Sequence, residues 1–206
     1  MHTAETADRP PVTPRPAASL LVLRDGAAGP EVLMGRRSAK HRFMPNRLVF
    51  PGGAADPDDG TAPAETPLAE HVAARLGLHA DASLVRALAI AGARELHEET
   101  GLSLGEPPRL DALDYIYRAI TPPVSPVRFD TVFFTVPASR VAGTIAGSGE
   151  LEELRFYGIA EALGLSLAFV TRAVLECTCR WLTLDMADRA AIGEVPVLRE
   201  TTMRES

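Results

Sequence analysis

The sequence predicts an α+β fold in which helices cover a mixed β-sheet. Apolar runs with the length and spacing of strands lie on both sides of a long helical pattern, at 18–37 and at 113–159. Strands and helices do not alternate strictly, which favours a mixed-sheet sandwich over a doubly wound parallel sheet. The chain has 206 residues, of which 46% are hydrophobic. That is enough for one sizeable core.

The first half of the chain contains three strand patterns and two helical patterns. In chain order they are strands 18–25, 30–37 and 46–53 and helices 67–76 and 81–100. The first two strands flank a Gly-bearing turn and predict a β-hairpin, and the third runs into Pro-Gly-Gly, a loop signal. The longer helix has Asp81 as an N-cap and Gly101 as its stop.

The second half predicts three more strands followed by two helices. In chain order they are strands 113–121, 128–136 and 151–159, a short helix from 159 and a long apolar helix over 165–184. No run of eighteen or more apolar residues exists, so we expect no membrane span. Residues 1–17, rich in Pro and Thr, predict a flexible leader to a single domain over 18–206.

Composition argues against several functional classes. The net charge is −6 and no basic stripe is present, so no affinity for nucleic acid is expected. The five histidines lack the spacing of metal ligands. The two cysteines, Cys177 and Cys179, indicate structural thiols in a cytoplasmic protein rather than a disulfide framework.

The most informative stretch is "RELHEETGL" at 94–102, which places an arginine and three carboxylates at the end of the long helix. At 100° per residue, Arg94, Glu98, Glu95 and Glu99 share one arc of about 140°. Their charges repel one another and lie at the helix end that disfavours anions. Two interpretations remain open on these residues alone: a solvated acidic face with an Arg94–Glu98 pair, or a site for a divalent cation, whose preferred ligands are carboxylate oxygens.

The same stretch resembles the second half of the Nudix box, Arg-Glu-apolar-x-Glu-Glu-x-Gly-apolar, at every position. "FPGG" at 50–53 is similar to the turn that leads into that box. The resemblance extends over most of residues 18–180. It implies a Nudix α/β/α sandwich and a hydrolase that cleaves the diphosphate of a nucleoside diphosphate linked to another group.

One departure from the family pattern concerns the first half of the box. The family has a Gly, five residues, a Glu, seven residues and then the Arg. Counting back from Arg94 places Arg86 at the Glu position, on a different face of the helix. Gly53 can serve as the box glycine if a helical insertion occupies about 54–80. The missing acid would then be Glu65 or Glu70, or would be dispensable.

Further stretches resemble the branch related to peroxisomal coenzyme A diphosphatases. They are "RRSAKHRFMPNRLVFPGGAADPDD" at 36–59, "ITPPVSPVRFDTVFFTV" at 120–136 and "ELEELRFYGIAEAL" at 150–163. The branch makes CoA or acyl-CoA the leading substrate class, with ADP-ribose and other nucleoside diphosphate derivatives as alternatives. Many relatives are homodimers, and the apolar C-terminal helices would supply an interface.

The resemblance assigns roles to individual residues. It makes Glu95, Glu98 and Glu99 the ligands of Mg²⁺ or Mn²⁺, with Arg94 orienting them. It implies a general base on a late loop, for which Glu150 is our choice over Glu152 and Glu153.

Four further residues are expected to face the substrate. Gly52 and Gly53 would let the backbone approach the phosphates closely. Arg36, together with Arg37, could meet a 3′-phosphate, or both could face water as edge-strand charges. Arg128 shares its strand face with Asp130, which favours a structural pair, and a phosphate contact by Arg128 is the alternative.

Two functions of other classes compete with the hydrolase. A Nudix-fold module that binds a nucleotide without cleaving it would explain the altered first half of the box, although it would not need all three glutamates. A structural protein with an acidic surface helix would not explain "FPGG" and "RFDT".

Overall fold

The structure is a computed structural model, and it describes residues 12–38 and 46–199. Residues 1–11 of the predicted leader and the Phe-Met-Pro stretch at 43–45 lie outside these ranges. Strand β1 begins at Arg15, two residues before the predicted end of the leader at residue 17.

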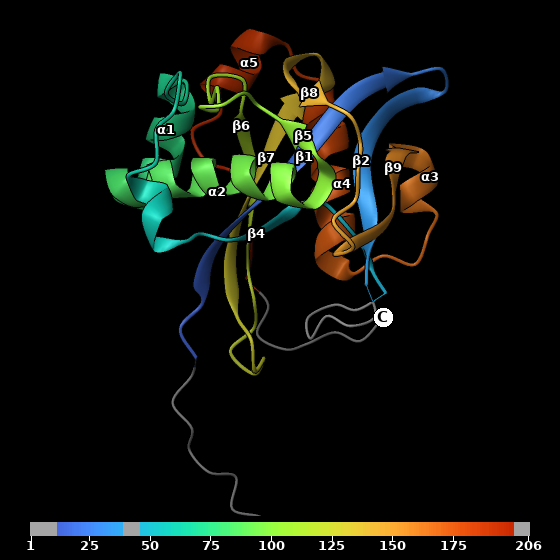
Figure 1. The fold of residues 1–206 in the computed structure, drawn as a ribbon, viewed down its shortest axis with the longest axis horizontal. Helices are drawn as coiled ribbons and strands as arrows, with labels where there is room; N and C mark the ends of the chain where they lie inside the picture. The colour runs from blue at the N-terminus through green and yellow to red at the C-terminus, as the bar shows by residue number, and fades with distance from the viewer. Residues whose placement is uncertain (1–11, 39–45, 200–206) are drawn as a thin grey trace, which may run out of the picture.

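The predicted α+β sandwich is confirmed. Helices α1 (Glu70–Gly77) and α2 (Ala82–Thr100) cover one face of a mixed sheet. Helices α3 (Ile159–Leu163) and α4 (Phe169–Leu182) pack on the opposite face. In Figure 1, α4 lies behind the sheet and α3 lies beside β9. Within the described ranges no single helix is long and apolar enough to cross a membrane. Only α1 and α2 taken together meet that criterion, and they are bent by 116°.

The main sheet has eight strands among the described residues, in the order β10-β6-β7-β1-β2-β3, with β4 paired to β1 and β9 to β2. They are β1 (Arg15–Gly26), β2 (Gly29–Arg37), β3 (Leu48–Val49), β4 (Gly52–Ala54), β6 (Asp114–Ile120), β7 (Phe129–Pro137), β9 (Leu151–Gly158) and β10 (Val197–Arg199). Strand β1 is the centre of the sheet because it pairs with β2, β4 and, in parallel, β7.

Most predicted elements are present, and one strand was predicted wrongly. The hairpin of β1 and β2 is confirmed. The single strand expected at 46–53 is two short strands with different partners, since β3 pairs with β2 and β4 with β1. Pro51 lies between them and has no N–H to donate to a continuous ladder.

The elements that the sequence did not reveal are short. They are the pair β5 (Leu102–Ser103) and β8 (Ala142–Gly143), strand β10, the 3₁₀ turns η1 (Pro57–Gly60) and η2 (Ala138–Arg140), and helix α5 (Met186–Ala191). Each has at most six residues, which is too few to establish a hydrophobic period.

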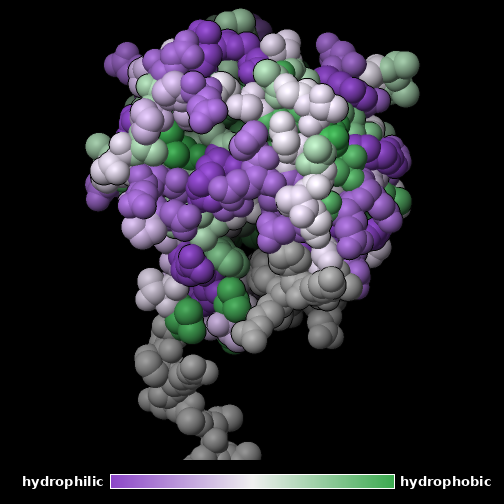
Figure 2. All heavy atoms as spheres, viewed as in Figure 1, coloured by the Kyte–Doolittle hydropathy of each residue, from purple (hydrophilic) through white to green (hydrophobic). Residues whose placement is uncertain are grey.

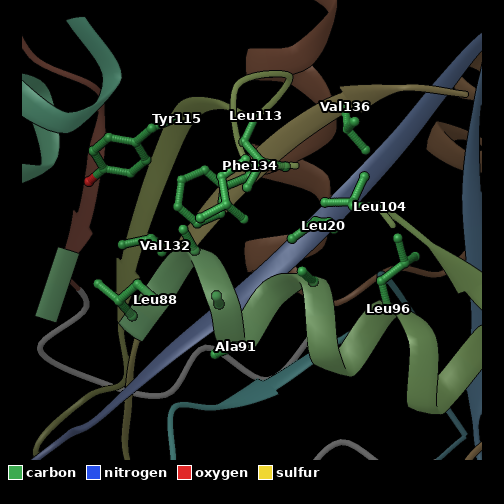
Figure 3. Packing of buried hydrophobic residues seen from close by; sticks show 14 of the residues in the cluster. Leu20, Leu88, Ala91, Leu96, Leu104, Leu113, Tyr115, Val132, Phe134 and Val136 are labelled. Atoms are coloured by element: carbon green, nitrogen blue, oxygen red, sulfur yellow. The ribbon is translucent and has the colours of Figure 1, made fainter. Parts of the chain in front are cut away.

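Helix α2 begins and ends where the sequence indicated. The Asp81 side chain accepts a hydrogen bond of 2.8 Å from the Leu84 N–H, and Gly101 ends the helix in the left-handed conformation. The helix lies close against β1 because residue 92 is glycine. A Cβ at Gly92 would overlap the Leu20 side chain. Figure 3 shows Leu88 and Leu96 of α2 among Leu20, Val132 and Phe134 of the sheet, where all five are buried.

The buried Arg75 joins α1 to the rest of the domain. Its side chain is 1% exposed and donates to Asp114 at 3.0 Å and to the Tyr115 carbonyl at 2.7 Å. It also donates to the carbonyls of Arg189 and Ile192 at 2.8 and 3.0 Å. Four acceptors around one buried cation fix α1 on β6 and on the C-terminal segment.

We predict that Arg75→Met lowers the free energy of unfolding by roughly 3 kcal/mol, because it leaves Asp114 and three carbonyls without their donor. Urea denaturation checks this. The matched control is Arg109→Met, which removes a half-exposed arginine and should cost less than about 1 kcal/mol. Equal effects of the two changes would contradict the role of Arg75.

Candidate functional site

The acidic residues lie at the C-terminal end of α2, and burial separates their roles. Glu98 is exposed, Glu95 is largely buried and the Glu99 residue is 1% exposed. Hydrophilic side chains cover the outer face of α2 in Figure 2. Val85, Ala89, Gly92 and Leu96 are buried on the neighbouring face of the helix.

Arg94 is the centre of the site. Its guanidinium donates to Glu95 at 2.8 Å and to Glu98 at 3.3 Å on its own helix. It also donates to Asp59 at 3.1 and 3.2 Å and to the Ala54 carbonyl at 3.0 Å. Asp56 lies 3.6 Å away. One cation therefore joins α2 to β4 and to η1, and its hydrogen bonds hold the Glu95 and Glu98 carboxylates.

Gly52 and Gly53 bring β4 against the carboxylates. The Gly52 N–H donates to the Glu99 carboxylate at 2.8 Å. A Cβ at Gly53 would overlap the Glu95 carboxylate, and one at Gly52 would overlap the backbone of Ala18. The close backbone approach expected of both glycines is present, and the group they approach in this structure is a glutamate.

The buried carboxylates hold their protons more tightly than usual. The pKa of Glu99 is raised to about 7, mainly by burial and to a smaller extent by the nearby charges of Glu95 and Glu150, against the lowering effects of the Gly52 N–H and Arg37. Burial also raises the pKa of Glu95, against the lowering effect of Arg94. A group of mutually repelling carboxylates in this setting is a candidate cation site.

The donor set suits a hard divalent cation, although the carboxylates are not gathered around a common point. Within the described ranges, no three His, Cys, Asp or Glu side chains form a ready metal-binding group. Two of the glutamates are engaged by Arg94 and the third by Gly52. Carboxylates that repel one another, beside a backbone kept open by two glycines, still fit such an ion by chemistry.

Sequence reasoning missed Asp59. The sequence left the missing acid of the box open between Glu65 and Glu70, or made it dispensable, and did not consider Asp59. Glu65 lies 3.6 Å from Arg109 instead. Asp59 is 4% exposed, bonds twice to Arg94 and accepts from the Asp56 N–H at 2.8 Å. Counting forward from Gly53 by the family spacing arrives at Asp59, whereas counting back from Arg94 does not.

Of the three candidate bases, Glu150 lies nearest the carboxylates. It is exposed on the loop before β9, and its charge acts on both Glu95 and Glu99. Glu153 is paired with Arg36 at 3.2 Å, and Glu152 is exposed opposite Arg36 on β9.

The two predicted substrate-binding arginines make no hydrogen bond to Glu95, Glu98 or Glu99 among the bonds that the structure shows. Arg36 donates to Glu153 and to the Asn46 carbonyl. Arg128 donates to the carbonyls of Thr121 and Val12 at 3.0 and 2.7 Å.

The pair expected between Arg128 and Asp130 was wrong, because Asp130 accepts two hydrogen bonds from Arg118 on the adjacent strand, at 2.7 and 2.6 Å. Arg118 is a diagonal neighbour of Asp130 across the β6–β7 pair, within reach of a long side chain. Besides Arg94, one further arginine acts on the site: the charge of Arg37 lowers the pKa of Glu99.

Comparison with known proteins identifies the fold. No family model and no curated protein matches the chain. A Nudix hydrolase from Alicyclobacillus acidocaldarius has a similar structure, with 29% identity, a TM-score of 0.62 and coverage of 80% of this chain and 90% of its own. A MutT protein from Methanosarcina mazei Go1 has 20% identity, a TM-score of 0.54 and coverage of 82% and 96%.

A third similar structure is the Nudix domain of Shewanella oneidensis NrtR in complex with ADP-ribose. It has 18% identity, a TM-score of 0.53 and coverage of 87% of this chain and 95% of its own. The fold is therefore the Nudix fold. The similarity to the Alicyclobacillus acidocaldarius hydrolase also supports an enzyme of the Nudix hydrolase class, as the sequence predicted.

We predict that Asp59→Asn slows hydrolysis about 10- to 100-fold, because the partner that fixes Arg94 loses its charge. The adjacent Asp58→Asn removes an exposed carboxylate and is the matched control. Turnover of a nucleotide substrate, with the unfolding midpoint measured alongside, checks this. Unchanged turnover in Asp59→Asn would remove Asp59 from the site.

A second prediction concerns pH. The pKa of Glu99 is about 7 in the folded protein and 4.5 as its ordinary value. The folded state therefore binds this proton more tightly than the unfolded state, so the contribution of Glu99 to stability is fully present below pH 4.5 and is lost as pH rises through 7. The slope from Glu99 is at most about 1.4 kcal/mol per pH unit.

Thermal unfolding between pH 4.5 and pH 8 in the presence of EDTA measures this slope. Glu99→Gln cannot titrate at that position and should show a flatter dependence. Equal slopes for the two proteins would contradict the assignment to Glu99.

Proposed function

We propose that the chain hydrolyses the diphosphate bond of a nucleoside diphosphate linked to another group, with Mg²⁺ or Mn²⁺ as cofactor. The observation that carries the proposal is the arrangement around Arg94, in which one cation holds Glu95 and Glu98 of α2 beside Asp59 and β4. A surface helix with no ligand would not need a buried Glu99 at the unfavourable end of its dipole.

Glu95, Glu98 and Glu99 would hold the ion. When bound, it would neutralise charge on the phosphate oxygens and lower the pKa of the attacking water. Arg94 keeps Glu95 and Glu98 on one side of the helix, and the backbone of Gly52 and Gly53 leaves room for the phosphates. We assign Glu150 as the base that takes the proton from the attacking water, since it is exposed beside Glu95 and Glu99.

We further propose that Asp59 supplies the acid of the first half of the box. Gly53, five residues and Asp59 follow the family spacing, with aspartate in place of glutamate. On this proposal the box is interrupted after Asp59 by 27 residues beyond the seven of the family spacing, and this insertion includes α1. This places its start six residues later than the sequence alone suggested.

CoA and acyl-CoA are the substrate class that we propose first. The proposal rests on the similarity of 36–59 and 120–136 to the coenzyme A diphosphatase branch. Arg37 supports it as a cation beside Glu99, and the exposed Arg36 next to it is available to a peripheral phosphate if its pair with Glu153 opens.

The test is product release from CoA, acyl-CoA, ADP-ribose, NADH, diadenosine polyphosphates and nucleoside triphosphates, each with Mg²⁺, Mn²⁺ or EDTA. Metal-dependent release of 3′,5′-ADP and phosphopantetheine from CoA is the expected result. Cleavage of another member would replace the CoA assignment. Thermal stabilisation by a nucleotide without cleavage of any member would replace the enzyme with a binding module.

We predict that Glu98→Gln abolishes turnover and leaves the fold intact, because Glu98 is exposed and its loss leaves no buried group unpaired. The control is Glu176→Gln, an exposed glutamate on α4 on the other face of the sheet. Turnover and circular dichroism spectra are measured for both variants. Near wild-type turnover in Glu98→Gln would refute the assignment of the site.

A further inference from the structure

A cavity of about 450 Å³ lies between α1 and the N-terminal half of α2. Its walls come from the segment 60–81, from the first turns of α2 and from the loop before β6. They include Pro67, Leu68, Gly77, Val85, Arg86 and Leu110. The volume is in the range of ordinary small-molecule sites. The described walls are mainly apolar, and no part of the proposed reaction uses them.

Polar contacts fix the walls from several sides. Arg75 anchors α1 through the four hydrogen bonds described above. The Thr66 hydroxyl donates to Asp111 at 2.6 Å, and the Thr66 carbonyl accepts from the Leu110 N–H at 3.3 Å. Arg86 donates to the Ala62 carbonyl. The cavity is therefore a feature of a braced structure rather than of a loosely packed loop.

Arg86 gives the cavity its chemical character. Among the described residues that line it, Arg86 alone carries a charge. A guanidinium has five N–H donors, and Arg86 uses one nitrogen for its bond to Ala62. An apolar wall with one arginine is complementary to a molecule that has an apolar body and one anionic group.

The cavity is separate from the glutamates. At 100° per residue, the mean direction of Ala82, Val85 and Arg86 is about 160° from that of Arg94 and the three glutamates. Arg86 also precedes Glu95 by nine residues, which is about 13 Å along the helix axis. An occupant of the cavity would therefore lie on the opposite flank of α2 and would not reach the reacting phosphates.

We propose that this cavity is a second ligand site, which binds a small apolar carboxylate. The apolar body fills the space between α1 and α2, and the carboxylate pairs with Arg86. Both walls that the ligand touches connect to the site, because α2 carries the glutamates and the segment 60–81 follows directly from Asp59. The ligand thus stabilises the position of α2 against this segment.

Calorimetric titration of the full chain with octanoate tests the proposal, with octanamide as the uncharged analogue. Gly77 offers a filling variant, because a Cβ there meets no atom within 4 Å. Gly193 has the same open surroundings away from the cavity, so Gly193→Leu is the matched control for Gly77→Leu. Arg86→Gln removes the charge and keeps a donor for Ala62.

The expected result is that Gly77→Leu weakens octanoate binding at least about tenfold and Gly193→Leu does not. Arg86→Gln should weaken octanoate about tenfold and leave octanamide unchanged, which keeps the test decisive if Gly77→Leu fails to fold. Glu98→Gln should bind octanoate normally.

Absence of saturable octanoate binding would overturn the proposal. So would binding that survives Gly77→Leu or is lost in Glu98→Gln. Equal binding of octanoate and octanamide, unaffected by Arg86→Gln, would overturn the carboxylate as the ligand class. None of these measurements requires turnover, so the result is independent of the proposed reaction.

Discussion

The guanidinium of Arg94 is the interaction on which the rest of the site depends. Three carboxylates in the last six residues of a helix repel one another and oppose the helix dipole. Arg94 offsets this by bonding two of them while it also holds Asp59 and the carbonyl of Ala54. The hydrogen bond to Asp59 is the main reason that the pKa of Arg94 is raised, so the cation stays charged at every pH at which the protein is folded.

That arrangement is possible only because α2 and β4 approach each other closely. Gly92 allows the helix to rest on Leu20 of β1, and Gly52 and Gly53 allow β4 to lie under Glu99 and Glu95. The pairing of β4 with the start of β1 then fixes the position of η1, which follows β4 in the chain and carries Asp59. Core packing therefore sets the geometry of the site, because α2 both packs on this hydrophobic cluster and carries the carboxylates.

Local signals carried most of the sequence prediction, and tertiary pairing caused its errors. The predicted ends of α2, at Asp81 and Gly101, are confirmed because capping is a property of neighbouring residues. The arc that Arg94 shares with the three glutamates followed from helical geometry alone. The strand at 46–53 and the Arg128–Asp130 pair were wrong because partners on β1 and β6 decide both. Asp59 was missed since 34 residues separate it from Arg94, and no periodicity connects them.

The contact between Asp59 and Arg94 also explains how the chain between them can be long. Both side chains are fixed by their own elements, Asp59 by η1 and Arg94 by α2, so their meeting does not depend on the length of the connection. The entropic cost of closing a loop grows only slowly with its length. Here part of that entropic cost is offset by bonds within the connection's own structure, because Arg75 and Thr66 attach it to β6 and to the loop before that strand. Because the segment 60–81 is held by these bonds, the cavity between α1 and α2 can exist without displacing Asp59, Arg94 or the glutamates.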